Sequence, residues 1–272
     1  MRKSMCPVQP FFLVNTTKYY KILGGDEPIA HYYSFTADNG DARHSVAVPD
    51  GCVDMLFTEY GGEIEGHLCG MVTKGESLSL RQGSRCFGVR FLPGFLPERL
   101  EVSIPELVNR RVGIGELSGG AGLLENIAGT QDFVDRTILL RDYIGGAWRC
   151  SELLQMLTQI VCELGGGARV RDLEKKTLYS ARYINRIFKQ NLGLSPKVFS
   201  EHVRFQSLLS NMNANGCDRL SDLAAKYGYC DQSHFTHEFK TFAAVTPGEY
   251  HGVVDLPHYK EKFVYLSPAD SS

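Results

Sequence analysis

No stretch of this 272-residue chain approaches the ~18 consecutive apolar residues that a membrane-spanning helix needs. The first residues carry positive charge, but Pro7 and Pro10 interrupt their short apolar run, so we expect no signal peptide. None of the 8 cysteines forms a C-x-x-C pair, and free thiols in a reducing compartment are therefore expected. These absences predict a cytoplasmic protein without membrane contact.

A strong excess of charge is also missing. The formal net charge is -2, which argues against a wholly basic nucleic-acid coat protein. The balance is uneven along the chain, however, because residues 169–251 contain twelve basic against eight acidic side chains, an excess of four. Such a modest basic excess is compatible with DNA contact in that segment.

The first 100 residues have the texture of a β-rich domain. Short runs rich in β-branched and aromatic residues are separated by turn sequences such as DNGD and PDG. Several short strands at this spacing predict a small barrel or sandwich. The expected strands are 31–35, 44–48, 52–57, 77–81 and 86–91.

The period changes to that of helices after about residue 104. Residues 133–144 have an apolar face and end at Gly145-Gly146, and this helix either packs on the barrel or mediates dimerisation. Ser151 is the expected N-cap of a further amphipathic helix, which the glycine run 165–167 ends. A domain boundary is therefore expected near residues 145–150.

Residues 219–251 predict a helix-turn-helix unit. A first helix is expected over Ser221–Tyr227, Gly228 supplies a left-handed turn residue, and Asp231 is the expected N-cap of the second helix. Phe235 and Phe239 are spaced i, i+4 and are assigned to the core. The outer face then carries hydrogen-bonding side chains suited to base edges in a major groove, namely Gln232, Ser233, Thr236 and His237.

A second copy lies upstream, in residues 170–199. Ser180 is its expected cap, and Ile184, Ile187 and Phe188 are its expected core residues. Both copies end on the pattern F-K-x(5)-[S/T]-P, in FKQNLGLSP at 188–196 and FKTFAAVTP at 239–247, 51 residues apart. The outward residues are candidates for reading guanine and adenine: Arg182, Asn185 and Arg186.

The pattern LAAKYGYCDQSHFTHEFK at 223–240, with TPGEY at 246–250, resembles the DNA-binding domain of AraC/XylS-type transcription regulators. The resemblance covers residues 151–251 and implies seven helices, with a long central helix here at 196–212 holding two recognition helices about one DNA turn apart. It also implies contacts to the DNA backbone from Ser180, Lys189, Asp231 and Lys240. The chain departs from the family pattern at Glu174, Leu178 and Ala244.

PDGCVDMLF at 49–57 and GVRFLPG at 88–94 resemble the amino-terminal domain of one uncharacterised subgroup of that family. The expected fold is therefore a two-domain α+β protein. Residues 1–147 form a β-rich, cupin-like barrel with helices that binds an effector or mediates dimerisation. Residues 148–252 form the all-α domain with two helix-turn-helix motifs, and residues 253–272 form a tail that either packs back or stays mobile.

The leading hypothesis is a sequence-specific regulator that binds double-stranded promoter or operator DNA and contacts RNA polymerase. A small-molecule effector or a homodimer would modulate it; alternatively, the amino-terminal domain docks a protein partner. By strand alternation, Asp54 and Arg90 either face solvent or line a polar spot in a pocket. The effector-binding residues are left unassigned.

The remaining alternative is an enzyme, a DNA-repair methyltransferase that carries a similar DNA-binding domain. It would need a four-cysteine zinc site and a nucleophilic cysteine in a P-C-H-R setting, and neither is present. A metal-dependent cupin would need clustered histidines, whereas no H-x-H pair occurs. We therefore expect no catalytic residue, no metal and no cofactor.

Overall fold

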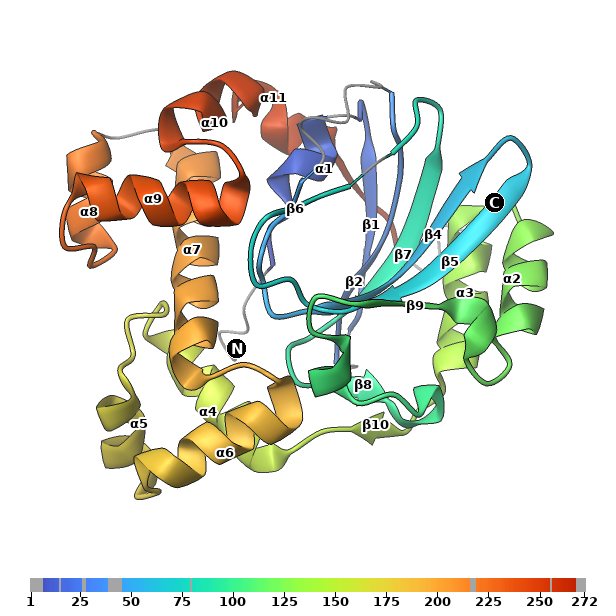
Figure 1. Cartoon of the computed structure of the whole chain (residues 1–272). Coiled ribbons are helices and arrows are strands. Elements are labelled where there is room, and N and C mark those ends of the chain that lie inside the picture. The colour runs from blue at the N-terminus through green and yellow to red at the C-terminus, as the bar shows by residue number, and fades with distance from the viewer. Residues whose placement is uncertain are drawn as a thin grey trace.

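The computed structural model describes residues 7–14, 16–25, 28–38, 46–78, 80–215, 219–254 and 256–267. A β-rich amino-terminal half lies beside a helical carboxy-terminal half (Figure 1). In the described ranges no helix combines the length and the apolar character required to cross a membrane. The architecture thus agrees with the expected two-domain α+β fold.

The main sheet has seven strands in the order β11-β1-β2-β7-β4-β5-β9. All its neighbours run antiparallel except β1 and β11, which are parallel. Two-stranded sheets, β3 with β6 and β8 with β10, flank it. The strands are β1 Tyr19–Leu23, β2 Ile29–Thr36, β3 Val46–Ala47, β4 Val53–Tyr60, β5 Glu63–Cys69, β6 Glu76–Ser77, β7 Arg85–Phe91, β8 Leu96–Pro97, β9 Arg111–Gly113, β10 Trp148–Arg149 and β11 Phe263–Tyr265.

One face of the sheet packs against α2 (Gly120–Ala128) and α3 (Phe133–Ile144). Helix α3 has the predicted bounds, begins at the N-cap Asp132 and ends at Gly145. Its apolar side joins the core, and the Phe133 and Phe87 rings meet edge to face at 5.9 Å. Packing on the sheet therefore accounts for the apolar face of α3.

The opposite face of the sheet is aromatic and faces the helical half. Tyr19, Tyr33 and Phe35 stack on one another, and Phe12 of α1 (Pro10–Val14) stacks on Phe35. The same hydrophobic cluster continues to Phe205 and Phe239 of the helical half. The two halves thus share a core.

Within the described residues, the helical half contains the seven helices that the resemblance implied. Its long central helix, α7, comprises 20 residues rather than the predicted 17. The set is α4 Glu152–Glu163, α5 Val170–Thr177, α6 Ala181–Leu192, α7 Pro196–Asn215, α8 Leu220–Lys226, α9 Gln232–Ala243 and α10 Pro247–Val253. The described part of the tail then forms α11 (Leu256–Tyr259), a short 3-10 turn and β11, which packs back on β1.

Three of the five predicted strands are confirmed, as β2, β4 and β7. The prediction over 77–81 was wrong, because the described strand there, β6, stops at Ser77. Of the prediction over 44–48, strand β3 covers Val46–Ala47 and Val48 lies beyond it, while residues 44 and 45 lie outside the described residues. The sequence reading missed β1 and β5, and also the short strands β8, β9, β10 and β11. In β5 the interrupting Gly66 is required by packing, since a Cβ there would lie 2.9 Å from side-chain atoms of Phe57 and Leu124.

Candidate nucleic-acid interface

The first helix-turn-helix unit consists of α5 and α6. Leu178, one of the positions at which the sequence departs from the family pattern, ends α5 in the left-handed conformation, with φ 60°. The Ser180 hydroxyl accepts a hydrogen bond from the Tyr183 amide, as a helix N-cap does. The carboxylate of Glu174 accepts a further bond from the Ala181 amide at 2.6 Å. The departure at Glu174 thus gives α6 a second cap.

The second unit consists of α8 and α9, and its corner follows the prediction closely. Gly228 has φ +72°, and the Asp231 carboxylate accepts a hydrogen bond from the His234 amide at 2.7 Å. Helix α8 begins and ends one residue earlier than predicted. Of the predicted core side chains, Ile184 and Phe188 in α6 and Phe235 and Phe239 in α9 are fully buried, whereas Ile187 is half-buried. Both recognition helices are therefore oriented by their apolar faces.

The outward face of α6 carries two arginines one helical turn apart. Arg182 and Arg186 are exposed, and the Arg186 guanidinium lies 4.7 Å from the centre of the Tyr183 ring. Asn185 is half-buried, and its side-chain amide donates to the carbonyl of Ala181 at 2.8 Å. Both arginine side chains are therefore accessible to a ligand. The Asn185 side-chain amide would first have to break its hydrogen bond to the Ala181 carbonyl.

The outward face of α9 is polar. Gln232, Ser233 and His237 are exposed. Thr236 is half-buried, and its hydroxyl donates to the carbonyl of Gln232 at 2.8 Å. Thr236 can therefore contact a base only through its methyl group and the lone pairs of its hydroxyl oxygen.

The four side chains expected at the DNA backbone differ in what they can offer. Lys240 is exposed, and the Lys189 ammonium lies 3.4 Å from the Gly193 carbonyl, so both bring positive charge to the surface. Ser180 and Asp231 are occupied as caps. Because a carboxylate repels phosphate, Asp231 can serve DNA only by ordering the amides at the start of α9.

Helix α7 orients the second unit through a network that the sequence reading missed. The Arg204 guanidinium donates to both carboxylate oxygens of Glu238 at 2.9 and 2.7 Å, and the Tyr229 hydroxyl donates to the same carboxylate. Arg204 also lies 4.6 Å from the centre of the Tyr229 ring. Both bonds come from one Arg204 nitrogen, Nη2, and this partly buried, charge-assisted pair restricts the orientation of α9 on α7.

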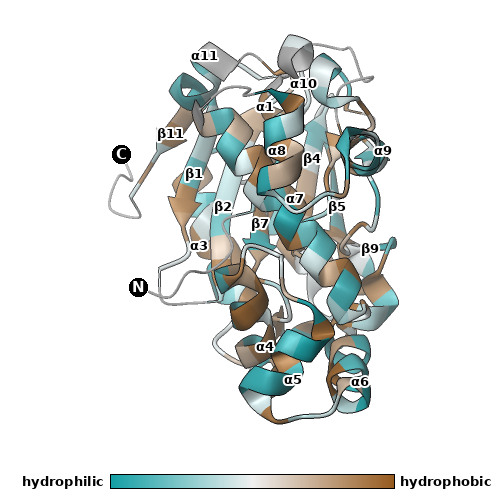
Figure 2. Cartoon of the chain, turned by 90° about the vertical axis from the view of Figure 1, so that its left-hand side faces the viewer, coloured by the Kyte–Doolittle hydropathy of each residue, from teal (hydrophilic) through white to brown (hydrophobic). Residues whose placement is uncertain are grey.

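Both units touch the β-rich half. The Gly75 amide donates to the Thr241 carbonyl near the end of α9. Near the end of α6, a Cβ on Gly193 would lie 2.6 Å from Val108. Between these points, the buried amide of Gln206 in α7 accepts from the Val8 amide and donates to the Pro49 carbonyl. Figure 2 views these helices from their side of the molecule and shows α5 coloured mostly hydrophilic.

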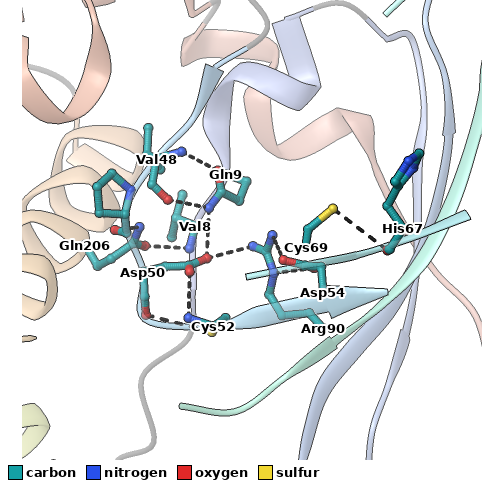
Figure 3. A network of polar contacts seen from close by, with 11 residues as sticks. Val8, Gln9, Val48, Asp50, Cys52, Asp54, His67, Cys69, Arg90 and Gln206 are labelled. Carbon is teal, nitrogen blue, oxygen red and sulfur yellow. Dashed lines mark hydrogen bonds and ion pairs between the residues drawn. The ribbon is translucent and has the colours of Figure 1, made fainter. Parts of the chain in front are cut away.

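The sheet holds a buried ionic cluster (Figure 3). Arg90 makes two hydrogen bonds to Asp54, at 2.9 and 2.8 Å, and an ion pair of 3.0 Å to Asp50. Gln9 and the Cys52 amide complete the partners of Asp50. Burial raises the pKa of Asp54, and Arg90 opposes that shift. The sequence left open whether Asp54 and Arg90 face solvent or line a polar spot in a pocket. The structure supports the second alternative.

The described residues contain no group of three His, Cys, Asp or Glu side chains placed to hold a metal ion.

Residues 173–252 match the family model described as a helix-turn-helix domain, and residues 26–113 match the Domain of unknown function (DUF6597). An uncharacterized HTH-type transcriptional regulator of Haemophilus influenzae is 34% identical over 83 residues, which cover 30% of this chain and 27% of that protein. The HTH-type transcriptional regulator YisR of Bacillus subtilis is 30% identical over 88 residues, covering 31% and 29%. The matched segment thus spans less than a third of these curated relatives.

Among solved structures, the C-terminal domain of AraT, a response regulator from Geobacillus stearothermophilus, aligns with a TM-score of 0.35 and 20% identity, over 38% of this chain and 85% of that one. ToxT from Vibrio cholerae aligns with a TM-score of 0.43 and 13% identity, over 87% and 96%. By its sequence, the segment 173–252 is an AraC-type helix-turn-helix domain. Residues 26–113 carry an uncharacterised domain, as the sequence resemblance implied.

The left-handed residue after α9 leads to a stability prediction. Ala244, one of the positions at which the sequence departs from the family pattern, has φ 59°, a left-handed conformation that favours glycine. We expect Ala244→Gly to raise the free energy of unfolding by about 0.5 to 1 kcal/mol, because glycine adopts this conformation without the Cβ clash. Denaturant unfolding measures the change. Ala225→Gly, at an exposed position of α8 with helical backbone, should instead lower stability, and equal effects of the two substitutions would contradict the argument.

Proposed function

We propose that this chain is a cytoplasmic, sequence-specific DNA-binding transcription regulator of the AraC/XylS type. The observation that carries the proposal is the pair of recognition helices, α6 and α9, which expose polar outer faces and are joined by one continuous helix, α7. With 20 residues, α7 is about 30 Å long. That length is close to the ~34 Å that separates successive major grooves on one side of DNA.

In this proposal each recognition helix reads one groove segment. Arg182 and Arg186 bind guanine edges, with Asn185 reading adenine. Gln232, Ser233, Thr236 and His237 read the next segment. Lys189 and Lys240 contact phosphates, and Ser180 and Asp231 order the helix ends that face the backbone.

We further propose that residues 1–147 are a regulatory domain, residues 148–252 the DNA-binding domain and residues 253–272 a tail. The contacts of Gly75 with Thr241 and of Gly193 with Val108 support regulation, because they connect the β-rich half to both recognition helices. A change in that half would shift the placement of both helices. Regulation by a small-molecule effector, formation of a homodimer and contact with RNA polymerase belong to the same proposal. Catalysis does not.

Selection of bound genomic fragments by the full-length protein tests this function. We expect one enriched site of about two helical turns, whose affinity falls steeply with salt. Arg186→Ala and His237→Ala should each weaken binding to that site by roughly 10-fold or more, since a well-placed base contact contributes about 1–3 kcal/mol.

The control is Arg81→Ala, which removes an exposed arginine from the β-rich half and should leave site affinity unchanged. Each variant is also measured on unrelated DNA, where loss of a base contact has little effect. Weak binding to all fragments, unaltered by Arg186→Ala and His237→Ala, would contradict base reading by α6 and α9.

A further inference from the structure

The two helix-turn-helix units carry different net charge. Counted from the N-cap of its first helix to the end of its second, the first unit occupies residues 169–192 and has seven basic against two acidic side chains. The second unit occupies residues 219–243 and has three basic against three acidic side chains. With histidines counted as neutral, the same arrangement of two helices is therefore built once with five excess positive charges and once with none.

The first helices of the two units can be aligned position by position. Each follows an arginine N-cap, Arg169 for α5 and Arg219 for α8. The left-handed residues at the two corners, Leu178 and Gly228, are likewise 50 positions apart. At this offset only one of three cations on α5 has a basic counterpart on α8. The pairs are Arg171 with Ser221, Lys175 with Ala225, and Lys176 with Lys226.

The three cations of α5 form an exposed surface, which we call the α5 basic face: Arg171, Lys175 and Lys176. Arg171 and Lys175 are four residues apart and therefore project from the same side of the helix. Within the part of the chain that the structure describes, none of the three cations forms an ion pair. The α5 basic face is thus available to an anionic partner.

The two acidic side chains of the first unit are engaged with backbone amides. Asp172 is half-buried, and its carboxylate accepts a hydrogen bond from the Arg169 amide at 2.9 Å. Glu174 is also half-buried and accepts from the Ala181 amide. Both carboxylates therefore serve as helix caps and are directed to the backbone rather than to the cations of α5.

The corresponding surface of α8 is close to neutral. Its cation Lys226 is accompanied by Asp222, and both side chains are exposed. The Ser221 hydroxyl donates to the Asp222 carboxylate at 3.3 Å, so this acidic group lies at the surface of α8. The recognition helices differ in the same sense. The outward face of α6 carries two arginines, whereas that of α9 offers amide, hydroxyl and imidazole groups.

The position of α5 determines which anion its basic face would meet. Helix α5 packs beside α6 at the outside of the helical half (Figure 1). In a helix-turn-helix unit, the helix that precedes the recognition helix crosses the DNA backbone. A row of phosphates is therefore the anionic surface that would lie along α5 when α6 enters a major groove.

We propose that the two units lie alike on DNA but contribute unequally to its binding because of these charges. The α5 basic face binds backbone phosphates, and with the cations of α6 it supplies most of the electrostatic affinity. The second unit adds sequence reading through neutral hydrogen bonds and releases few counterions. This inference rests on the proposed function, because it takes DNA as the ligand of both units.

The first test gives α5 the residues that α8 carries, in the double variant Arg171→Ser, Lys175→Ala. We expect the plot of log affinity against log salt for the selected site to become shallower by about 1.8, since each phosphate contact contributes about 0.9. At about 0.1 M salt, affinity should fall more than ten-fold. The loss should be similar on unrelated DNA, because phosphate contacts carry no sequence information. Fluorescence anisotropy of labelled DNA measures both.

The second test makes the reverse exchange, in the double variant Ser221→Arg, Ala225→Lys. Both positions are exposed. If α8 lies along the backbone as α5 does, the two added cations should steepen the salt dependence by about 1.8 and raise the affinity for both kinds of DNA. An unchanged salt dependence would show that the units differ in placement rather than in charge and would overturn the proposal.

The control, Lys18→Ala with Arg81→Ala, removes the same charge from exposed positions of the β-rich half. It should leave the salt dependence unchanged, and a loss equal to that of the α5 variant would attribute the effect to net charge alone and refute the α5 basic face. An unchanged midpoint of thermal unfolding shows that each variant is folded.

Failure of this inference can be distinguished from failure of the proposed function. A selected site that the α5 variant binds with wild-type affinity and salt dependence would overturn only this inference and assign the α5 basic face to another partner, such as an acidic protein. A protein that selects no site, but whose binding to unrelated DNA responds to both exchanges as expected, would support the unequal contribution and overturn only sequence-specific regulation.

Discussion

Gly166→Ala is expected to lower the free energy of unfolding by about 2 to 5 kcal/mol. Gly166 has φ +78°, and a Cβ there would lie 2.3 Å from the Arg204 amide nitrogen and 2.4 Å from the Ser200 carbonyl oxygen. The left-handed backbone costs an alanine about 1–2 kcal/mol, and overpacking adds about 1–3 kcal/mol. Both colliding atoms belong to the backbone of α7, so they can move away only if the helix itself shifts.

The adjacent Gly165 is a matched control for this prediction. It is also left-handed, with φ +57°, but the nearest atom to its Cβ would be the Ser207 hydroxyl at 4.0 Å. Gly165→Ala should therefore cost only the conformational part, about 1–2 kcal/mol. Urea unfolding followed by circular dichroism measures both variants. If the two substitutions cost the same, the close approach of residue 166 to α7 is refuted.

Arg90→Met is expected to destabilise the protein by about 3 to 5 kcal/mol at neutral pH, because it leaves Asp50 and Asp54 buried without their cation. The loss should depend on pH. Burial already raises the pKa of Asp54, and removal of the opposing arginine raises it further. A carboxyl group whose pKa is higher in the folded than in the unfolded state lowers stability as pH rises through that interval. The deficit relative to the wild type should therefore be smaller at acidic pH than at pH 8.

Denaturant unfolding of both proteins across this pH range measures the deficit. Arg85→Met serves as the comparison, since Arg85 pairs with Glu59 through a side chain that is 46% exposed. Exposed pairs contribute about 0–1 kcal/mol, so this loss should be small. A deficit for Arg90→Met that stays constant or grows toward acidic pH would show that Asp54 is not the group responsible.

The helix-turn-helix units could be predicted from sequence because their signals are local. Gly228 and Asp231 lie within a few residues of the helices they end and begin, and the core phenylalanines of α9 are one turn apart. The same holds for α3, whose predicted bounds agree with the structure. The assignments of individual side chains to bases and phosphates remain predictions.

Strand predictions succeeded where burial imposed a pattern and failed where it did not. The alternating burial of β4 follows its sequence, whereas β5 carries charged residues and a glycine that packing demands. Strand β11 has only three residues and takes its structure from pairing with β1, more than 240 positions away. Whether such a short strand forms depends on the strand with which it pairs, and the sequence does not show which strand that is.

The sequence by itself determined the two recognition helices, their caps and the division into a β-rich and a helical half, since these depend on helical periodicity and on turn residues close in the chain. Tertiary structure decided the burial of Arg90 between Asp50 and Asp54 and the close approach of Gly166 to α7. Those features join distant segments, as when Gln206 binds Val8 across 198 positions. Their formation requires that the chain first bury a shared core, so the physical cause is packing rather than local propensity.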